Sequence, residues 1–77
     1  MKNGEGAAVS GIIDSWKNAK NAYVARYYKH HMRYLKNPND LVNKGAMLEN
    51  CYVLINIFGC SKEDIQEIEK YGFLENN

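Results

Sequence analysis

Five residues in the first half of the chain have the types and spacing to bind a phosphate-bearing ligand. They recur every three or four positions, as residues on one face of a helix do: Trp16, Lys20, Tyr23, Tyr27 and His31. Aromatic rings can stack on a nucleobase, and a cation between them can contact a phosphate. The same pattern also suits a tyrosine-rich core whose lysine extends to the helix edge, although each buried hydroxyl then needs a hydrogen-bond partner.

A second set of residues forms a basic stripe on the opposite face of the same predicted helix. Spacings of three, four and three positions align its members: Arg26, Lys29, Arg33 and Lys36. Such a stripe could follow a nucleic-acid backbone. A solvated face is the alternative, as is docking against the acidic second half of a neighbouring subunit. The formal net charge is only +1, which weakens the case for nucleic acid.

Residues that could support catalysis or bind a metal are few and poorly spaced. The sequence has no glycine-rich phosphate loop, no HExxH pattern and no nucleophile elbow. His30 and His31 are adjacent, so on a helix they diverge by about 100° and cannot chelate one ion. Cys51 and Cys60 match no metal-ligand or CxxC spacing. We therefore expect no enzymatic activity, no cofactor and no metal.

The cysteines and the hydropathy pattern predict a cytoplasmic protein. Continued helix would hold Cys51 and Cys60 about 13 Å apart, too far for a disulfide, and reduced thiols are typical of the cytosol. Residues 7–13 are too short for a signal peptide and are followed by Asp14. Spanning a bilayer takes about 20 mainly apolar residues, and the most apolar run contains Lys44 and Glu49, so no membrane contact is expected.

That most apolar run, residues 41–58, is the stretch around which the other elements must be organised. Wound as a helix it is apolar on almost every side, and one of its stripes consists of Leu41, Leu48, Tyr52 and Ile55. Such a helix must be covered by the other helices or by a second copy. Gly45 lies within it at a cost of about 1 kcal/mol relative to alanine, which predicts a close approach by side chains of the first helix.

The first helix is predicted over residues 11–36, with Ser10 as its N-cap. Pro38 ends it and suits the first position of a new helix, with Asn37 as the cap. So short a connection predicts an antiparallel hairpin in which paired residue numbers sum to about 75, so that Trp16 meets Gly59. A third helix over residues 62–71 begins at a Ser61–Asp64 capping box and ends at Gly72, and we expect it to pack across one end of the hairpin.

Together these patterns predict an all-α fold, an antiparallel helical hairpin plus a short third helix, completed by oligomerisation into a helical bundle. Residues 1–9 are expected to be a flexible arm and residues 10–77 a single three-helix domain. The predicted function is a small non-enzymatic interaction protein, a regulator or inhibitor of the kind that phages or mobile elements encode. It would bind a protein partner through a tyrosine-rich apolar helical surface. The alternative is a binder of a nucleotide, cyclic nucleotide or nucleic acid that uses the aromatic and basic residues.

Overall fold

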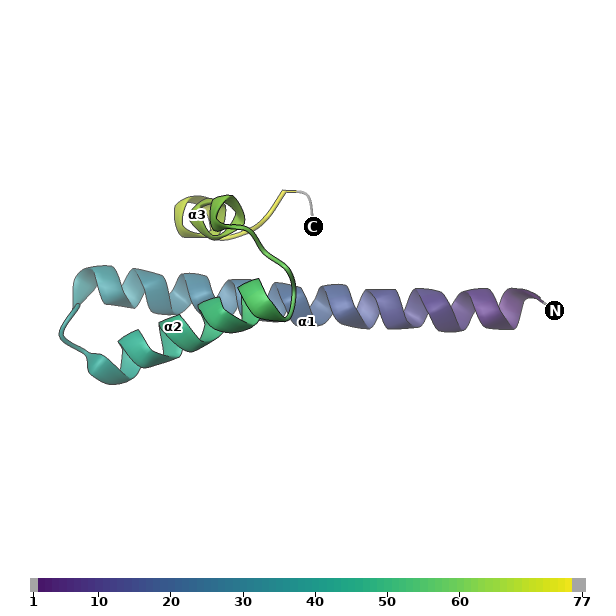
Figure 1. Cartoon of the computed structure of the whole chain (residues 1–77), viewed down its shortest axis with the longest axis horizontal. Coiled ribbons are helices and arrows are strands. Elements are labelled where there is room, and N and C mark those ends of the chain that lie inside the picture. The colour runs from purple at the N-terminus through teal and green to yellow at the C-terminus, as the bar shows by residue number, and fades with distance from the viewer. Residues whose placement is uncertain (1, 76–77) are drawn as a thin grey trace.

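The computed structural model consists of three helices that form the predicted hairpin and short third helix (Figure 1). It describes the backbone of residues 2–75 and the side chains of residues 11–75. The helices are α1 (Lys2–Lys36), α2 (Leu41–Asn56) and α3 (Lys62–Tyr71). No strand occurs in the part of the chain that the structure describes. The predicted all-α class is therefore confirmed.

Helix α1 begins at Lys2 rather than at Gly11, so the predicted cap at Ser10 is wrong. No proline interrupts residues 2–36, and nothing else in this segment forces a helix end. At about 1.5 Å per residue, α1 is about 52 Å long and α2 about 24 Å. The N-terminal half of α1 therefore extends well beyond the end of α2 (Figure 1). Flexibility of residues 1–9 stays a prediction.

The turn between α1 and α2 is capped by a different residue from the one predicted. Asn37 closes a β-turn, since its carbonyl accepts from the backbone N–H of Asp40 at 3.2 Å, and Pro38 occupies the turn position that favours proline. Asp40 is the N-cap of α2, and its carboxylate accepts from the backbone N–H of Asn43 at 3.0 Å. Helix α2 thus starts at Leu41 instead of residue 38, and it ends at Asn56 instead of residue 58.

The core lies where the three helices meet. It is formed by residues of all three helices and of the α2–α3 connection: Val24, Tyr27, Met47, Leu54, Cys60, Ile65 and Ile68. Leu54 and Ile68 are fully buried. The predicted hairpin register agrees with the contacts observed, since Trp16 packs on Phe58 and His30 binds Asn43. Both pairs have numbers that sum close to 75.

Helix α2 is covered by the rest of the chain on one side only. Asn43, Met47 and Leu54 are buried, whereas Leu41, Leu48 and Tyr52 are exposed. The predicted close approach to Gly45 is wrong, because among the described residues no atom beyond its chain neighbours and the local α2 backbone lies within 4 Å of the position that a Cβ would occupy. The reason is rotational: Gly45 lies on the face of α2 that points away from α1.

Helix α3 has the predicted bounds and the predicted caps. The Ser61 hydroxyl accepts from the backbone N–H of Asp64 at 3.1 Å, and the Asp64 carboxylate accepts from that of Ser61 at 3.0 Å. Gly72 ends the helix with a left-handed φ of 85°. Helix α3 packs across α1 beside Tyr27 and Tyr28 (Figure 1). Its position is therefore on the side of the hairpin rather than across its end.

Alanine substitutions of three glycines are expected to have different effects on stability. At Gly72 a Cβ would meet the Tyr28 ring at 3.2 Å in addition to the strain of a positive φ, which by itself costs about 1–2 kcal/mol. Gly59 also has a positive φ but open space around it, so only the conformational cost applies. In dilute solution Gly45→Ala should stabilise the fold by about 0.5–1 kcal/mol.

Urea unfolding followed by far-UV circular dichroism measures these three free energies of unfolding. The expected order of stability is Gly45→Ala above the unsubstituted protein, then Gly59→Ala, then Gly72→Ala. If Gly72→Ala were no less stable than Gly59→Ala, the packing of Tyr28 against the end of α3 would be refuted.

Candidate binding surface

The structure does not gather the five predicted ligand-binding residues into one open site. Tyr27 is buried in the core, Tyr23, Lys20 and His31 are half-buried, and Trp16 is exposed. The His31 ring stacks on Tyr27 with centroids 6.0 Å apart and planes 20° apart. The inner part of this aromatic face is therefore packing, as the core interpretation expects, and only its N-terminal end at Trp16 is open.

The Tyr27 hydroxyl has its hydrogen-bond partner within the chain. It donates to the Glu69 carboxylate of α3 at 2.5 Å. Burial raises the pKa of Tyr27 well above the usual tyrosine range, and Glu69 raises it further through the hydrogen bond and its charge. The bond joins residues 42 positions apart, and no local sequence pattern indicated Glu69 as the partner.

The two cysteines lie within or against the core. Burial raises the pKa of the Cys51 thiol, and the charge of Glu69 adds to this effect. Burial also raises the pKa of the Cys60 thiol, although the charge of Lys20 opposes the rise. A raised pKa keeps a thiol protonated at neutral pH, and the thiolate is the nucleophilic form. Burial of the two thiols therefore favours their protonated, less nucleophilic form.

A buried asparagine fixes the end of the hairpin near the turn. The Asn43 side-chain amide donates to the His30 carbonyl oxygen at 2.9 Å, and its Oδ1 lies 2.8 Å from His30 Nδ1. Because Oδ1 can only accept, Nδ1 of His30 must carry the proton. Both polar ends of the buried amide are thus satisfied. In sequence this asparagine is only a polar interruption of an apolar helix, so its role was missed.

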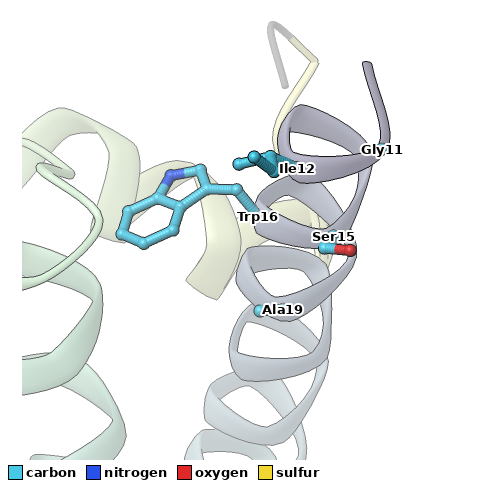
Figure 2. Close-up of a pocket in the computed structure, with 5 residues that line it drawn as sticks. All are labelled: Gly11, Ile12, Ser15, Trp16 and Ala19. Carbon is cyan, nitrogen blue, oxygen red and sulfur yellow. The ribbon is translucent and has the colours of Figure 1, made fainter. Parts of the chain in front are cut away.

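An open hollow lies on the part of α1 that extends beyond the hairpin (Figure 2). It has a volume of about 560 Å³ and is lined by Gly11, Ile12, Ser15, Trp16 and Ala19. Gly11, Ser15 and Ala19 are small, while Ile12 and the Trp16 indole project from the same side of the helix (Figure 2). The indole packs on Phe58 with ring centroids 4.7 Å apart. We refer to these five residues as the Trp16 hollow.

The residues of the basic stripe, Arg26, Lys29, Arg33 and Lys36, are all exposed. The Arg26 guanidinium lies over the Tyr23 ring, 5.1 Å from its centroid. Arg33 and Lys36 occupy the last turn of α1, where cations interact favourably with the helix dipole. The presence of Arg26, Arg33 and Lys36 in the stripe can therefore be explained by interactions within the chain, without a ligand.

Among the described residues, no three histidine, cysteine or acidic side chains gather closely enough to hold a metal ion. None of the described helices combines the length and apolarity that crossing a bilayer demands.

Comparison with known proteins gives no match. No protein-family model, no curated protein and no solved structure matches the sequence. What the chain does must therefore be inferred from its own residues, distances and exposed surfaces.

Proposed function

We propose that this chain is a small, non-enzymatic, cytoplasmic interaction protein of the regulator or inhibitor type. It acts by occupying a protein partner, and it also associates with itself. The observation that carries the proposal is the Trp16 hollow, where Ile12 and Trp16 remain 71% and 52% exposed beside small residues on the part of α1 that extends beyond α2. Tryptophan is enriched among residues that dominate the binding energy of protein interfaces.

The shape of the hollow favours an apolar helix or loop as the part of the partner that binds. The small residues Gly11, Ser15 and Ala19 allow close approach to the α1 backbone. The Trp16 indole supplies a flat apolar surface beside them. Trp16 is held by Phe58, so little side-chain freedom is lost on binding. A preordered aromatic residue at a concave surface lowers the entropic cost of association.

Substitution of Trp16 by alanine should weaken partner binding strongly. The test is affinity capture from an extract of the cell that encodes the chain, at low and at high salt, followed by identification of the retained protein and titration with it. Hot-spot residues contribute about 2 kcal/mol or more, so Trp16→Ala should weaken binding by about 30-fold or more. A mainly apolar interface should survive high salt.

Ile12 and Ile13 provide a matched pair of variants. Both are exposed isoleucines of α1, but they point about 100° apart, and only Ile12 lines the hollow. Ile12→Ala should weaken capture and Ile13→Ala should not. Equal losses in both variants, or unchanged capture by Trp16→Ala, would refute the Trp16 hollow as the binding surface.

The alternative, a nucleotide or nucleic-acid binder, draws its support from the exposed basic stripe and from Lys20. Thermal melting against nucleotides, cyclic dinucleotides and short oligonucleotides tests it. A ligand at about 100 times its Kd adds about 2.7 kcal/mol. A shift that Lys20→Ala or Arg33→Ala removes without unfolding the chain would favour this alternative. Hydrolysis of any of these compounds at a rate proportional to the protein concentration would refute both non-enzymatic hypotheses.

A further inference from the structure

One side of α2 carries an apolar stripe that the described part of the chain leaves largely exposed. The stripe consists of Leu41, Gly45, Leu48, Tyr52 and Ile55, and we call it the outer stripe. Its large side chains are exposed by 75% (Leu41), 55% (Leu48), 64% (Tyr52) and 39% (Ile55). The positions alternate in steps of four and three, the spacing by which one helix presents a continuous seam to another helix.

The outer stripe is complementary in size to itself when it is reversed about Leu48. Leu41 lies seven positions before Leu48, and Ile55 lies seven after it. Gly45 lies three before Leu48, and Tyr52 four after it. An antiparallel two-fold pair therefore sets leucine against isoleucine at both ends and glycine against tyrosine between them. A two-fold interface requires such self-complementarity, because the same patch is present on both subunits.

We propose that a second copy of this chain packs antiparallel along the outer stripe, with the two Leu48 side chains at the two-fold axis. The proposal rests on the self-association included in the proposed function and specifies its surface and orientation. It does not depend on the Trp16 hollow, which lies on α1. Lys44 and Glu49 flank the seam on opposite sides and are exposed, as expected of a polar rim.

Gly45 gives the strongest reason for the antiparallel orientation. Beyond its chain neighbours and the local helix backbone, no atom of the described residues lies within 4 Å of its would-be Cβ, so their packing does not explain a glycine that weakens the helix by about 0.5–1 kcal/mol. In the antiparallel pair the gap at Gly45 receives the partner's Tyr52. A parallel pair would set glycine against glycine and leave a void, and unfilled voids are destabilising in packed interfaces.

The exposed area predicts a weak dimer. We take about 100 Å² for a fully exposed aliphatic side chain and about 200 Å² for a tyrosine. With the exposed fractions above, the outer stripe then offers about 300 Å² of apolar surface per copy. Two copies would bury roughly 900 Å² in total if apolar atoms form about two thirds of the interface. A stable interface needs about 1,000 Å² or more, so dissociation should occur at micromolar concentration or above.

Single cysteine substitutions test the orientation directly. Helix axes 8–10 Å apart, with Cα atoms about 2.3 Å from each axis, place the two Leu48 Cα atoms about 3.4–5.4 Å apart, a span that overlaps the disulfide range. The two Leu41 Cα atoms would be separated by about 21 Å along the axes. Mild oxidation should therefore link L48C into a covalent dimer but not L41C, whereas a mixture of L41C and I55C should link. Unsubstituted protein measures the background from Cys51 and Cys60.

Light scattering and sedimentation over about two orders of magnitude in concentration test the surface. The mass should rise above the 8.8 kDa of one chain. Leu48→Glu should weaken association by at least about tenfold, because it buries two like charges at the axis. Leu35→Glu, at an exposed leucine of α1, should leave it unchanged. Gly45→Leu should weaken association while preserving or raising monomer stability, because leucine fills the gap yet favours helix.

Each other result has a distinct meaning. A mass near 8.8 kDa at every concentration would refute self-association and this inference together. If the dimer formed equally well with Leu48→Glu, self-association would stand, but the outer stripe would be refuted as its interface. Cross-linking of both L41C and L48C would indicate a parallel pair, and tighter association of Gly45→Leu would show that no partner side chain occupies the gap. The last two results would also refute the inference.

Discussion

Leu54→Ala is expected to lower the free energy of unfolding by about 2–5 kcal/mol, the range for removing a fully buried leucine side chain. Leu54 has no exposed surface and lies in the core between the helices. Single domains have only about 5–15 kcal/mol of stability in total. In a domain of this size each kcal/mol corresponds to about 4–8 °C in Tm, so the variant should melt at least about 8 °C lower.

Leu48→Ala is the matched control, since it removes the same atoms from the same helix. Leu48 is exposed in the single chain, and exposed substitutions usually change stability by about 0.5 kcal/mol or less. Both variants should be compared by urea unfolding in dilute solution, where any dimer has dissociated. A loss of stability at Leu48 as large as that at Leu54 would contradict the exposure of Leu48, because it would mean that the outer side of α2 is covered in the single chain.

The parts of the fold that could be predicted best are those decided by neighbouring residues. The bounds of α3 follow from Ser61 and Asp64, which satisfy each other's backbone groups, and from Gly72, which accepts the left-handed conformation. These interactions span at most three or four residues, so the sequence contains all the information they need. The hairpin is predictable for the same reason, because Pro38 must interrupt a helix and the turn is short.

Boundaries were predicted less well where two local solutions compete. Asn37 and Asp40 can both cap a helix, and the structure uses Asn37 to close the turn and Asp40 as the cap. The difference is worth only about 1 kcal/mol or so, too little to decide from sequence. The start of α1 at Lys2 is a similar case, since Ser10 is an acceptable cap but no residue compels the helix to begin there.

The candidate site was harder to predict because rotation about a helix axis is set by long-range packing. Residue spacing puts the aromatic residues on one face of α1. Whether that face meets solvent or α3 depends on Ile65 and Ile68, which belong to the same core cluster as Tyr27. The same holds for Gly45: its position within α2 could be predicted, but not whether its face of the helix points toward α1 or toward solvent. Residues 42 positions apart, such as Tyr27 and Glu69, meet only once the helices are docked.

The buried contact between Tyr27 and Glu69 should make the protein lose stability in alkaline solution. Burial and Glu69 raise the pKa of Tyr27 in the folded state, whereas in the unfolded chain a tyrosine has a pKa of about 10. Below that pH both states keep the proton, and the contribution to stability is complete. As the pH rises above about 10, the unfolded state loses the proton first, so the free energy of unfolding should fall by up to about 1.4 kcal/mol per pH unit.

Tyr27→Phe should remove this pH dependence at the cost of a hydrogen bond. A hydrogen bond to a charged group contributes about 1.5–3 kcal/mol, so the variant should be less stable than the unsubstituted protein by about that amount at neutral pH. Above pH 10 the difference should shrink, because only the protein with Tyr27 continues to lose stability from this group. The raised pKa values of Cys51 and Cys60 act in the same direction but are common to both proteins, so they cancel in the comparison.

Tyr52→Phe is the control for this experiment, since it removes the same hydroxyl from an exposed tyrosine of α2. Urea unfolding at a series of pH values from neutral to strongly alkaline should give curves for Tyr52→Phe that follow the unsubstituted protein throughout. The Tyr27→Phe curve should start lower and approach them above pH 10. If all three curves fell in parallel, the Tyr27 hydroxyl would be releasing its proton as easily in the folded chain as in the unfolded one. The hydrogen bond from Tyr27 of α1 to Glu69 of α3 would then be absent in solution.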